Sequence, residues 1–184
     1  MALKTLLLLL IAAALYSQEN IAVLELDPDG VTASEAKTMT NKLRGELFST
    51  GQFTVIERAQ MDQILKEQGF QQTGCTSQTC VVEVGQLLGV KSMVAGSIGK
   101  VGAIYLVSLR LIDVAKGNVV RNADVEVEGD ISEVLRQGVH DAARKIAGLE
   151  PDHAPPPPPA VQEAAPAEPE KLSPMMPQKR MRKK

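Results

Sequence analysis

Residues 21–56 read IAVLELDPDGVTASEAKTMTNKLRGELFSTGQFTVI, and this stretch predicts a strand, a helix and a second strand. Ile21 to Asp27 is a short run of apolar, β-forming residues that ends in turn-prone residues. Thr32 and Glu35 have the spacing of a capping box, and one helical face then carries Ala36, Met39, Leu43 and Leu47. Phe53 to Ile56 forms the second strand. Because a helix separates the two strands, we expect a right-handed parallel βαβ crossover.

Two more helices are predicted on either side of a loop that holds both cysteines. In the first, Met61, Ile64 and Leu65 face inward, and Gly69 ends the helix. Ser77 or Thr79 caps the second, shorter helix, and Gly89 ends it. Its predicted inward positions are Val81, Val84, Leu87 and Leu88.

Three strands with no helix between them follow at Ser92–Ile98, Ile104–Asp113 and Val119–Val127, which predicts an antiparallel meander. In the last strand every second residue is polar, as in a strand with one face in water. The inward set is Val119, Arg121, Ala123, Val125 and Val127. Asp130 caps a final helix whose apolar stripe is Ile131, Val134, Leu135, Val139, Ala142 and Ile146, and the folded part is expected to end near Gly148.

These elements predict an α/β fold, with a mixed sheet of about five strands and helices packed on it. A parallel βαβ unit is followed by the antiparallel meander. We expect one domain over residues 18–149, because about 130 residues supply one hydrophobic core and not two. A signal peptide is expected at residues 1–17 and a disordered proline-rich tail at residues 150–184.

The first residues, MALKTLLLLLIAAALYSQEN, have the pattern of a secretory signal peptide. Lys4 precedes an apolar run from Leu6 to Tyr16, and small residues lie before the polar Gln18. The run is shorter than the roughly 20 apolar residues that span a bilayer. No cysteine follows it as an acceptor for a lipid, so a soluble periplasmic or secreted protein is expected. The formal net charge of −2, the absence of tryptophan and the low aromatic content argue against nucleic acid as a partner.

The order of elements and three stretches resemble the CsgG-type domain. The stretches are GELFSTGQFTVIERAQMDQILKEQGF (45–70), GQLLGVKSMVAGSIGKVG (85–102) and LRLIDVAKGNVV (109–120). That domain is similar to the N-terminal domain of TolB and to the LpoB activators of penicillin-binding proteins. The resemblance implies a domain of the cell envelope that works by binding other proteins, either in a secretion ring or docked on an envelope enzyme. CsgG builds a pore with long inserted hairpins, but the connections here at 99–102 and 115–118 are turn-sized, so no pore is expected.

Cys75 and Cys80 are the chain's two cysteines, and in an exported protein they are predicted to form a disulfide. A zinc site needs about four ligands, and beyond this pair the chain offers only His140 and His153. The C-x4-C spacing differs from the C-x-x-C of redox pairs. A nucleophilic cysteine needs an oriented histidine, and His140 is interpreted as a helical surface residue. Two roles for this disulfide remain open: it could only stabilise the loop, or it could hold the loop rigid as a binding site for a partner.

Nothing in the sequence predicts catalysis, a cofactor or a metal. The glycines from Gly96 to Gly102 lack the Ser or Thr that follows Lys in a phosphate-binding loop, and they should join two strands, with Lys100 in the turn. The strand carboxylates alternate along a solvated face. We therefore expect a protein that is not an enzyme.

The tail from Glu150 has few residues that could build a core and many prolines, so it is predicted to be a disordered spacer. It ends in a basic cluster, defined here as Lys179, Arg180, Arg182, Lys183 and Lys184. This cluster could bind anionic lipid or acidic polysaccharide, or it could be a solvated terminus without a partner.

Two functional hypotheses follow. The first is an exported interaction domain that docks on envelope machinery for secretion, assembly or peptidoglycan synthesis, or that self-associates. The alternative is a periplasmic domain that binds a small ligand, such as a glycan fragment, beside the cysteine loop. Copurification of a stable protein partner favours the first, and a thermal shift with cell-wall fragments favours the second.

Overall fold

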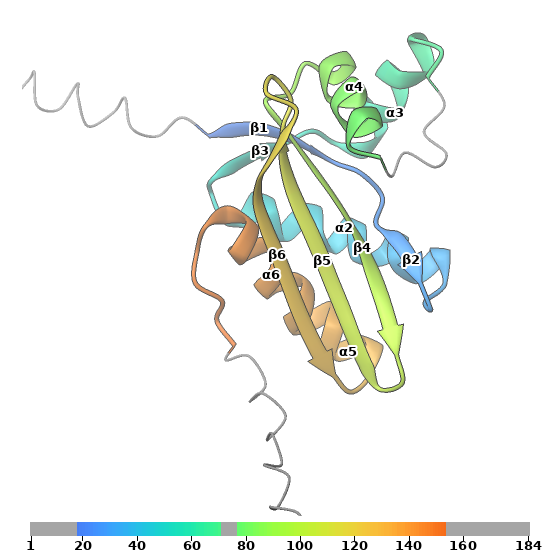
Figure 1. Cartoon of the computed structure of the whole chain (residues 1–184), viewed down its shortest axis with the longest axis vertical. Helices are drawn as coiled ribbons and strands as arrows, with labels where there is room; N and C mark the ends of the chain where they lie inside the picture. Colours follow the sequence, from blue (N-terminus) through green and yellow to red (C-terminus); the bar gives the residue numbers. More distant parts are fainter. Residues whose placement is uncertain (1–17, 71–76, 154–184) are drawn as a thin grey trace, which may run out of the picture.

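The computed structural model describes residues 18–70 and 77–153. Within them a six-stranded mixed sheet carries helices on both faces, which confirms the α/β prediction (Figure 1). The strands are β1 (Glu19–Val23), β2 (Asp27–Asp29), β3 (Phe53–Val55), β4 (Ser92–Val101), β5 (Ile104–Asp113) and β6 (Asn118–Glu128). The helices are α2 (Ala33–Ser49), α3 (Arg58–Glu67), α4 (Gln78–Leu88), α5 (Ile131–Glu133) and α6 (Val139–Ala147).

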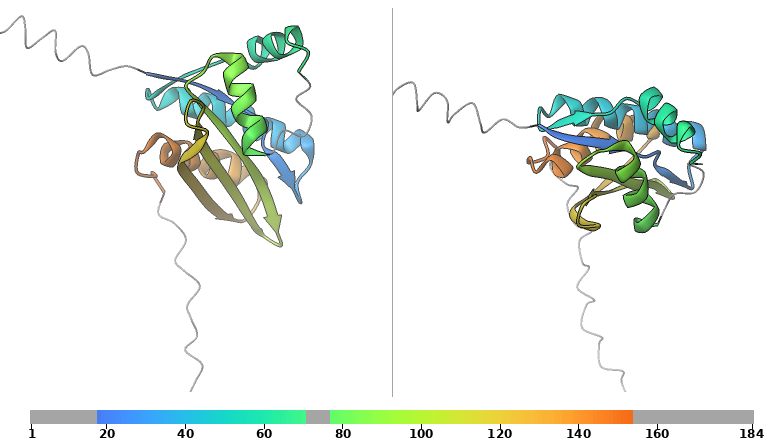
Figure 2. Two further views of the ribbon diagram at one scale, coloured as in Figure 1. Left: turned by 45° about the horizontal axis from the view of Figure 1, so that its top comes forward. Right: turned by 90° about the horizontal axis from the view of Figure 1, so that it is seen from above.

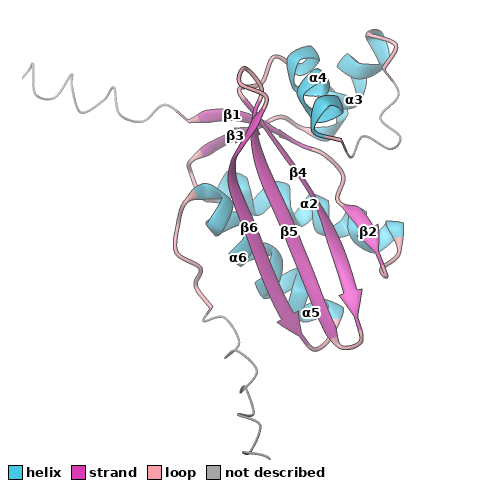
Figure 3. Cartoon of the chain, viewed as in Figure 1, coloured by secondary structure: helices cyan, strands magenta, loops and turns pink. Residues whose placement is uncertain are grey.

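The strand order is β3-β1-β4-β5-β6, with β2 paired to the far part of β4. β1 is parallel to both β3 and β4, so the predicted βαβ unit is present. β4, β5 and β6 form the predicted antiparallel meander (Figure 3).

The first predicted strand, Ile21–Asp27, is divided in the structure. β1 ends at Val23, and pairing to β4 resumes at Asp27. Between them the Leu26 N–H donates to the Thr40 hydroxyl of α2 at 3.0 Å, in the buried interior. The Thr40 side chain thus satisfies a backbone donor that the sheet leaves unpaired. Because the predicted strand is divided into β1 and β2, the sheet has six strands and not five.

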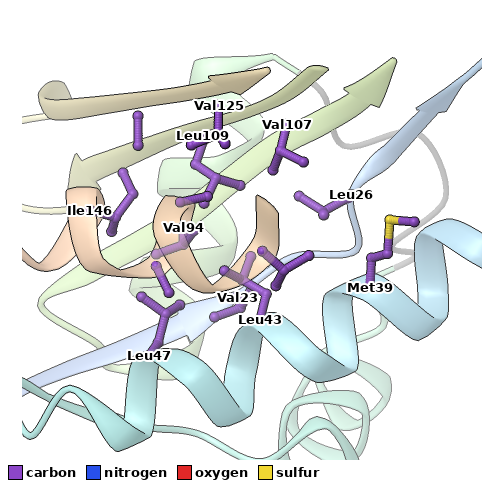
Figure 4. Close-up of a cluster of buried hydrophobic side chains, with 14 of the residues drawn as sticks. Val23, Leu26, Met39, Leu43, Leu47, Val94, Val107, Leu109, Val125 and Ile146 are labelled. Atoms are coloured by element: carbon purple, nitrogen blue, oxygen red, sulfur yellow. The ribbon is translucent and has the colours of Figure 1, made fainter. Parts of the chain in front are cut away.

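Two hydrophobic cores lie on opposite faces of the sheet. The larger packs α2 and α6 against the sheet, with Leu43, Val94 and Ile146 at its centre (Figure 4). The smaller packs α3 and α4 through Met61, Leu65 and Val84 against Met93 and Ile112. The views in Figure 2 show α2 and α4 on opposite sides of the strands.

The helix ends follow the sequence signals. Thr32 and Glu35 form a reciprocal capping box on α2, and Ser77 accepts from the Cys80 N–H at the start of α4. Gly89 ends α4 in the left-handed conformation, with φ of +64°. The prediction that Leu87 faces inward was wrong, because its side chain is 38% exposed. The buried residues of α4 are Val81, Val84, Gly85 and Leu88, so Gly85 and not Leu87 belongs to the face that packs on the sheet.

The regular alternation predicted for β6 was wrong at one end. A register shift between Leu111 and Ile112 pairs Leu111 with Arg121 but Ile112 with Val119. Val119 therefore packs with the smaller core, whereas Arg121 lies on the other face and donates to the Ile146 carbonyl. An extra residue in one strand of a pair moves every side chain beyond it to the opposite face of the sheet.

The final helix is not one continuous α-helix. Asp130 caps it as predicted, but a π turn at Val134–Gly138 separates α5 from α6. The π turn passes close to the sheet at Gly138, where a Cβ would lie 2.8 Å from Val127 Cγ2. Val134, Val139, Ala142 and Ile146 are buried, as the predicted stripe required.

Candidate functional site

The helices α3 and α4 cover only part of their face of the sheet, and the remainder of β4, β5 and β6 is uncovered in Figures 1 and 2. Directly paired residues lie on the same side of a sheet, so the register identifies what this uncovered part presents. We call it the open face. It consists of Ser97, Gly99, Val101, Ile104, Leu106, Ser108, Arg110, Asn122, Asp124, Glu126 and Glu128.

One end of the open face carries apolar side chains in contact with water. Val101 is 81% exposed, Ile104 48% and Leu106 40%. They lie on both strands of the β4–β5 hairpin, whose turn is made by Gly102 with φ of +61°. We call these three residues the apolar stripe. The alternation of a solvated strand would place polar side chains at these positions.

An acidic row borders the apolar stripe. Glu128 is paired with Ile104, Glu126 with Leu106 and Asp124 with Ser108. Opposite residues on one face have Cβ atoms about 5 Å apart, so the carboxylates lie beside the apolar side chains. The open face thus joins apolar surface to negative charge.

A recess of about 330 Å³ lies where the open face meets the segment between β1 and β2. Its polar lining includes Glu25, Asp27, Arg110, Asn122 and Asp124. Glu25 pairs with Arg58 of α3 at 3.2 Å. Carboxylates, an amide and a guanidinium that converge in one recess can bind a small polar molecule.

A second polar cluster, which the sequence did not predict, lies around His140. Its Nδ1 is 2.7 Å from Glu46 of α2, and its Nε2 is 2.9 Å from Asp152. Arg144 also pairs with Asp152, at 3.1 Å. The hydrogen bonds that His140 makes to Asp152 and then to Glu46 raise its pKa, while desolvation by burial lowers it. The histidine is thus a link between two helices and the segment after α6.

The segment that follows α6 is also held at Asp141. This carboxylate is 5% exposed, accepts the Asp152 N–H at 3.2 Å and lies 3.0 Å from His153 Nδ1. His140 and His153 meet edge to face, with ring centroids 6.3 Å apart. The partners of His140 and Asp141, which are Glu46, Asp152 and His153, lie at least 11 residues away in the sequence, so helical spacing could not have indicated these contacts.

The predicted site residues lie partly outside the described residues. Cys80 is in the first turn of α4, but Cys75 is outside them, so the disulfide between the two stays a prediction. The basic cluster, Lys179, Arg180, Arg182, Lys183 and Lys184, is also outside them. Lys100, predicted in the turn, lies instead within β4 with its ammonium 4.8 Å from the centroid of the Tyr105 ring.

Within the described ranges, no group of three or more His, Cys, Asp or Glu side chains is placed to hold a metal ion. None of the helices in those ranges is both long enough and apolar enough to cross a bilayer. The glycine-containing stretch from Gly96 to Gly102 forms the second half of β4 and the start of the turn into β5, and it opens no helix.

Comparison with known proteins confirms the predicted resemblance. The model of the family described as "Curli production assembly/transport component CsgG" matches residues 25–103, from the end of β1 to the β4–β5 turn. No curated protein sequence matches the chain.

Two solved structures share the fold. The C-terminal domain of LpoB from Salmonella enterica is 16% identical, with a TM-score of 0.53, and the match covers 62% of this chain and 85% of that one. Lipoprotein GNA1162 from Neisseria meningitidis is 14% identical, with a TM-score of 0.52, covering 61% and 82%. At these identities the likeness concerns the fold alone.

Proposed function

We propose that this chain is an exported, non-enzymatic interaction domain of the cell envelope, and that it docks on a protein partner through the open face. The apolar stripe of Val101, Ile104 and Leu106 carries the proposal, because these side chains are exposed next to one another and contiguous exposed apolar surface marks an interaction site. The match to the CsgG family model supports the location in the envelope.

The shape of the open face fits a protein partner. A sheet that presents an apolar stripe beside a row of carboxylates offers a dry centre and a charged border, which is how stable interfaces are arranged. The partner expected here has an apolar contact surface with basic side chains beside it. Envelope machinery for secretion, assembly or peptidoglycan synthesis, and a second copy of this chain, are the candidates we retain.

The test is capture of crosslinked partners from the protein's own envelope with the full chain and two variants. Ile104→Ser removes the centre of the apolar stripe, and loss of one buried anchor should weaken binding about ten-fold. Val120→Ser is the matched control, because Val120 has the same exposed fraction of 48% but lies near the other end of β6. A partner retained equally by both variants would exclude the open face, and recovery of the protein's own copies alone would favour self-association.

The recess favours a second candidate function, the binding of a small polar ligand. A volume of about 330 Å³ lies at the lower end of the range of ligand sites, and Arg110 offers a planar donor to a carboxylate or sugar. The recess lies between the sheet and the segment that joins β1 to β2, whereas the sequence analysis placed the ligand beside the cysteine loop. Cell-wall fragments should then raise the melting temperature of the full chain but not of Arg110→Ala. Absence of any shift at millimolar fragment would exclude this function.

A further inference from the structure

The outer edge of the sheet forms one wall of a groove. β6 is the last strand, and within the described residues it pairs with β5 alone. A groove of about 620 Å³ runs along it, walled on the other side by α6 and the segment that follows α6. In Figure 1 this segment, drawn in orange, lies beside β6.

The groove is acidic. Asp124, Glu126, Glu128 and Glu150 line it, and all four are exposed. Lys145 and His153 also line the groove, and both are engaged. Lys145 donates to the Asp124 carbonyl at 2.8 Å, and His153 contacts the buried Asp141. The four exposed carboxylates therefore leave negative charge for an occupant to neutralise.

The groove also offers hydrogen bonds to an extended chain. An edge strand presents backbone N–H and C=O groups that no neighbour satisfies, and β6 is eleven residues long. In the described part of the groove one such group, the Asp124 carbonyl, is occupied by Lys145. A peptide that ran along the strand could pair with other backbone groups while its side chains met the carboxylates.

The described part of the chain ends at this groove. His153 is the last described residue and lines the groove, so the described chain ends beside the groove. Residues 154–178 connect His153 to the basic cluster, which has five cations among six residues. Twenty-five residues span at most about 80–90 Å when fully extended, and the eleven residues of β6 are about 35 Å long. The connection is therefore long enough to reach every part of the groove.

We propose that the groove beside β6 is the docking site of the chain's own basic segment, Lys179–Lys184, which binds within the same molecule. Tethering gives that segment a local concentration in the millimolar range, so contacts that are individually weak suffice. Carboxylates of the groove then neutralise the lysine and arginine side chains. Asp124, Glu126 and Glu128 belong to both surfaces, so a docked segment occupies the charged border of the open face and leaves the apolar stripe uncovered.

Other occupants fit the groove less well. A second β6 strand would bring Asp124, Glu126 and Glu128 close to their own copies, and like charges across a strand pair are destabilising. An anionic membrane would be repelled by the same carboxylates. A basic segment is therefore the favoured occupant, and the chain carries one at the right distance.

The test places a photoreactive benzoylphenylalanine at position 181 of the full chain and maps its crosslinks by mass spectrometry. Crosslinks are expected on residues 124–128 and 137–150. A mixture of light and heavy isotope-labelled chains distinguishes crosslinks within one molecule from those between copies. Glu126→Lys should reduce the intramolecular yield about five-fold, as should roughly 0.5 M salt. The matched control is Glu83→Lys, an equal charge change on the exposed side of α4, and it should leave the yield unchanged.

The outcomes separate clearly. Restoration of the yield when Lys183→Glu is added to Glu126→Lys would support a direct charge contact. Crosslinks that are scattered over the surface, that join different copies, or that persist in Glu126→Lys would overturn the proposal. Crosslinks lost on addition of anionic phospholipid vesicles, but present without them, would support the docking and show that lipid competes for the segment. Because no partner protein is needed, failure here would leave the function proposed for the open face untouched.

Discussion

Single glycines decide how closely the helices approach this sheet. Gly85 lies on the inner side of α4, where a Cβ would stand 2.4 Å from Val114 Cγ2 and 2.8 Å from Met93 Cγ. Gly45, in α2, has no atom within 4 Å of the corresponding position. Both are helical glycines, so they have the same intrinsic cost and differ only in their surroundings.

Gly85→Ala and Gly45→Ala should therefore change the free energy of unfolding in opposite directions. Gly85→Ala overpacks the smaller core, which typically costs about 1–3 kcal/mol and outweighs the gain in helix propensity. Gly45→Ala adds a methyl group in open space and should stabilise by about 0.5–1 kcal/mol. Urea denaturation of the two variants and the parent measures both effects. Equal stabilisation by both would show that α4 does not pack on β4 as described.

At the scale of elements, three segments meet at His140. It lies on α6 and contacts Glu46 of α2 and Asp152 of the segment after α6. Lys42 also pairs with Glu46, and Arg144 with Asp152, so each carboxylate facing His140 has a second cation. The hydrogen bond from His140 lowers the pKa of Asp152, while the pKa of His140 itself is raised. Protonated His140 thus holds the chain where it leaves the domain.

This link should weaken as pH rises. A histidine with a raised folded pKa contributes stability that is complete below its unfolded value of about 6.5 and is lost as pH rises through the folded pKa. NMR titration should show Glu150 to His153 becoming more mobile over that interval. His140→Gln should remove the pH dependence, whereas His153→Gln should leave the His140 transition in place. A titration of His140 at its ordinary pKa, with no change in the segment, would contradict the structure.

At the scale of the whole molecule, the predicted disulfide depends on the compartment in which the protein resides. Export is predicted from residues 1–17, and pairing of Cys75 with Cys80 follows from an oxidising compartment. Cys80 lies where α4 begins, so a bridge there would fix the loop between α3 and α4. Neither prediction depends on the open face or on the groove.

The intact mass of the protein purified from its own cells tests both predictions together. We expect a chain that begins near Gln18 and has the mass of the oxidised dithiol, which takes up alkylating reagent only after reduction. A chain without residues 2–17 is the matched control, since it should remain in the cytosol with both thiols reduced. An uncleaved chain in the envelope, or reactive thiols in the exported protein, would refute export or pairing respectively.

Local signals in the sequence were sufficient for the elements and much of the topology. Capping at Thr32, Ser77 and Asp130, and helix ends at Gly89 and Gly148, depend on neighbours within a few residues, so they can be read along the chain. The parallel crossover and the meander follow from the order of strands and helices. The resemblance to CsgG-type domains rests on the same stretches.

Contacts between distant residues were decided by the tertiary structure alone. The bulge at Val119 and Arg121, the inward place of Gly85 and the break between β1 and β2 each depend on which strand or helix lies opposite. The same holds for the open face, which exists because α3 and α4 are too short to cover it, and for the groove, which needs β6 and the segment after α6 side by side. Periodicity and helix capping depend on residues that are close in the sequence. The open face and the groove depend on which helices and strands pack against each other, and those elements are distant in the sequence.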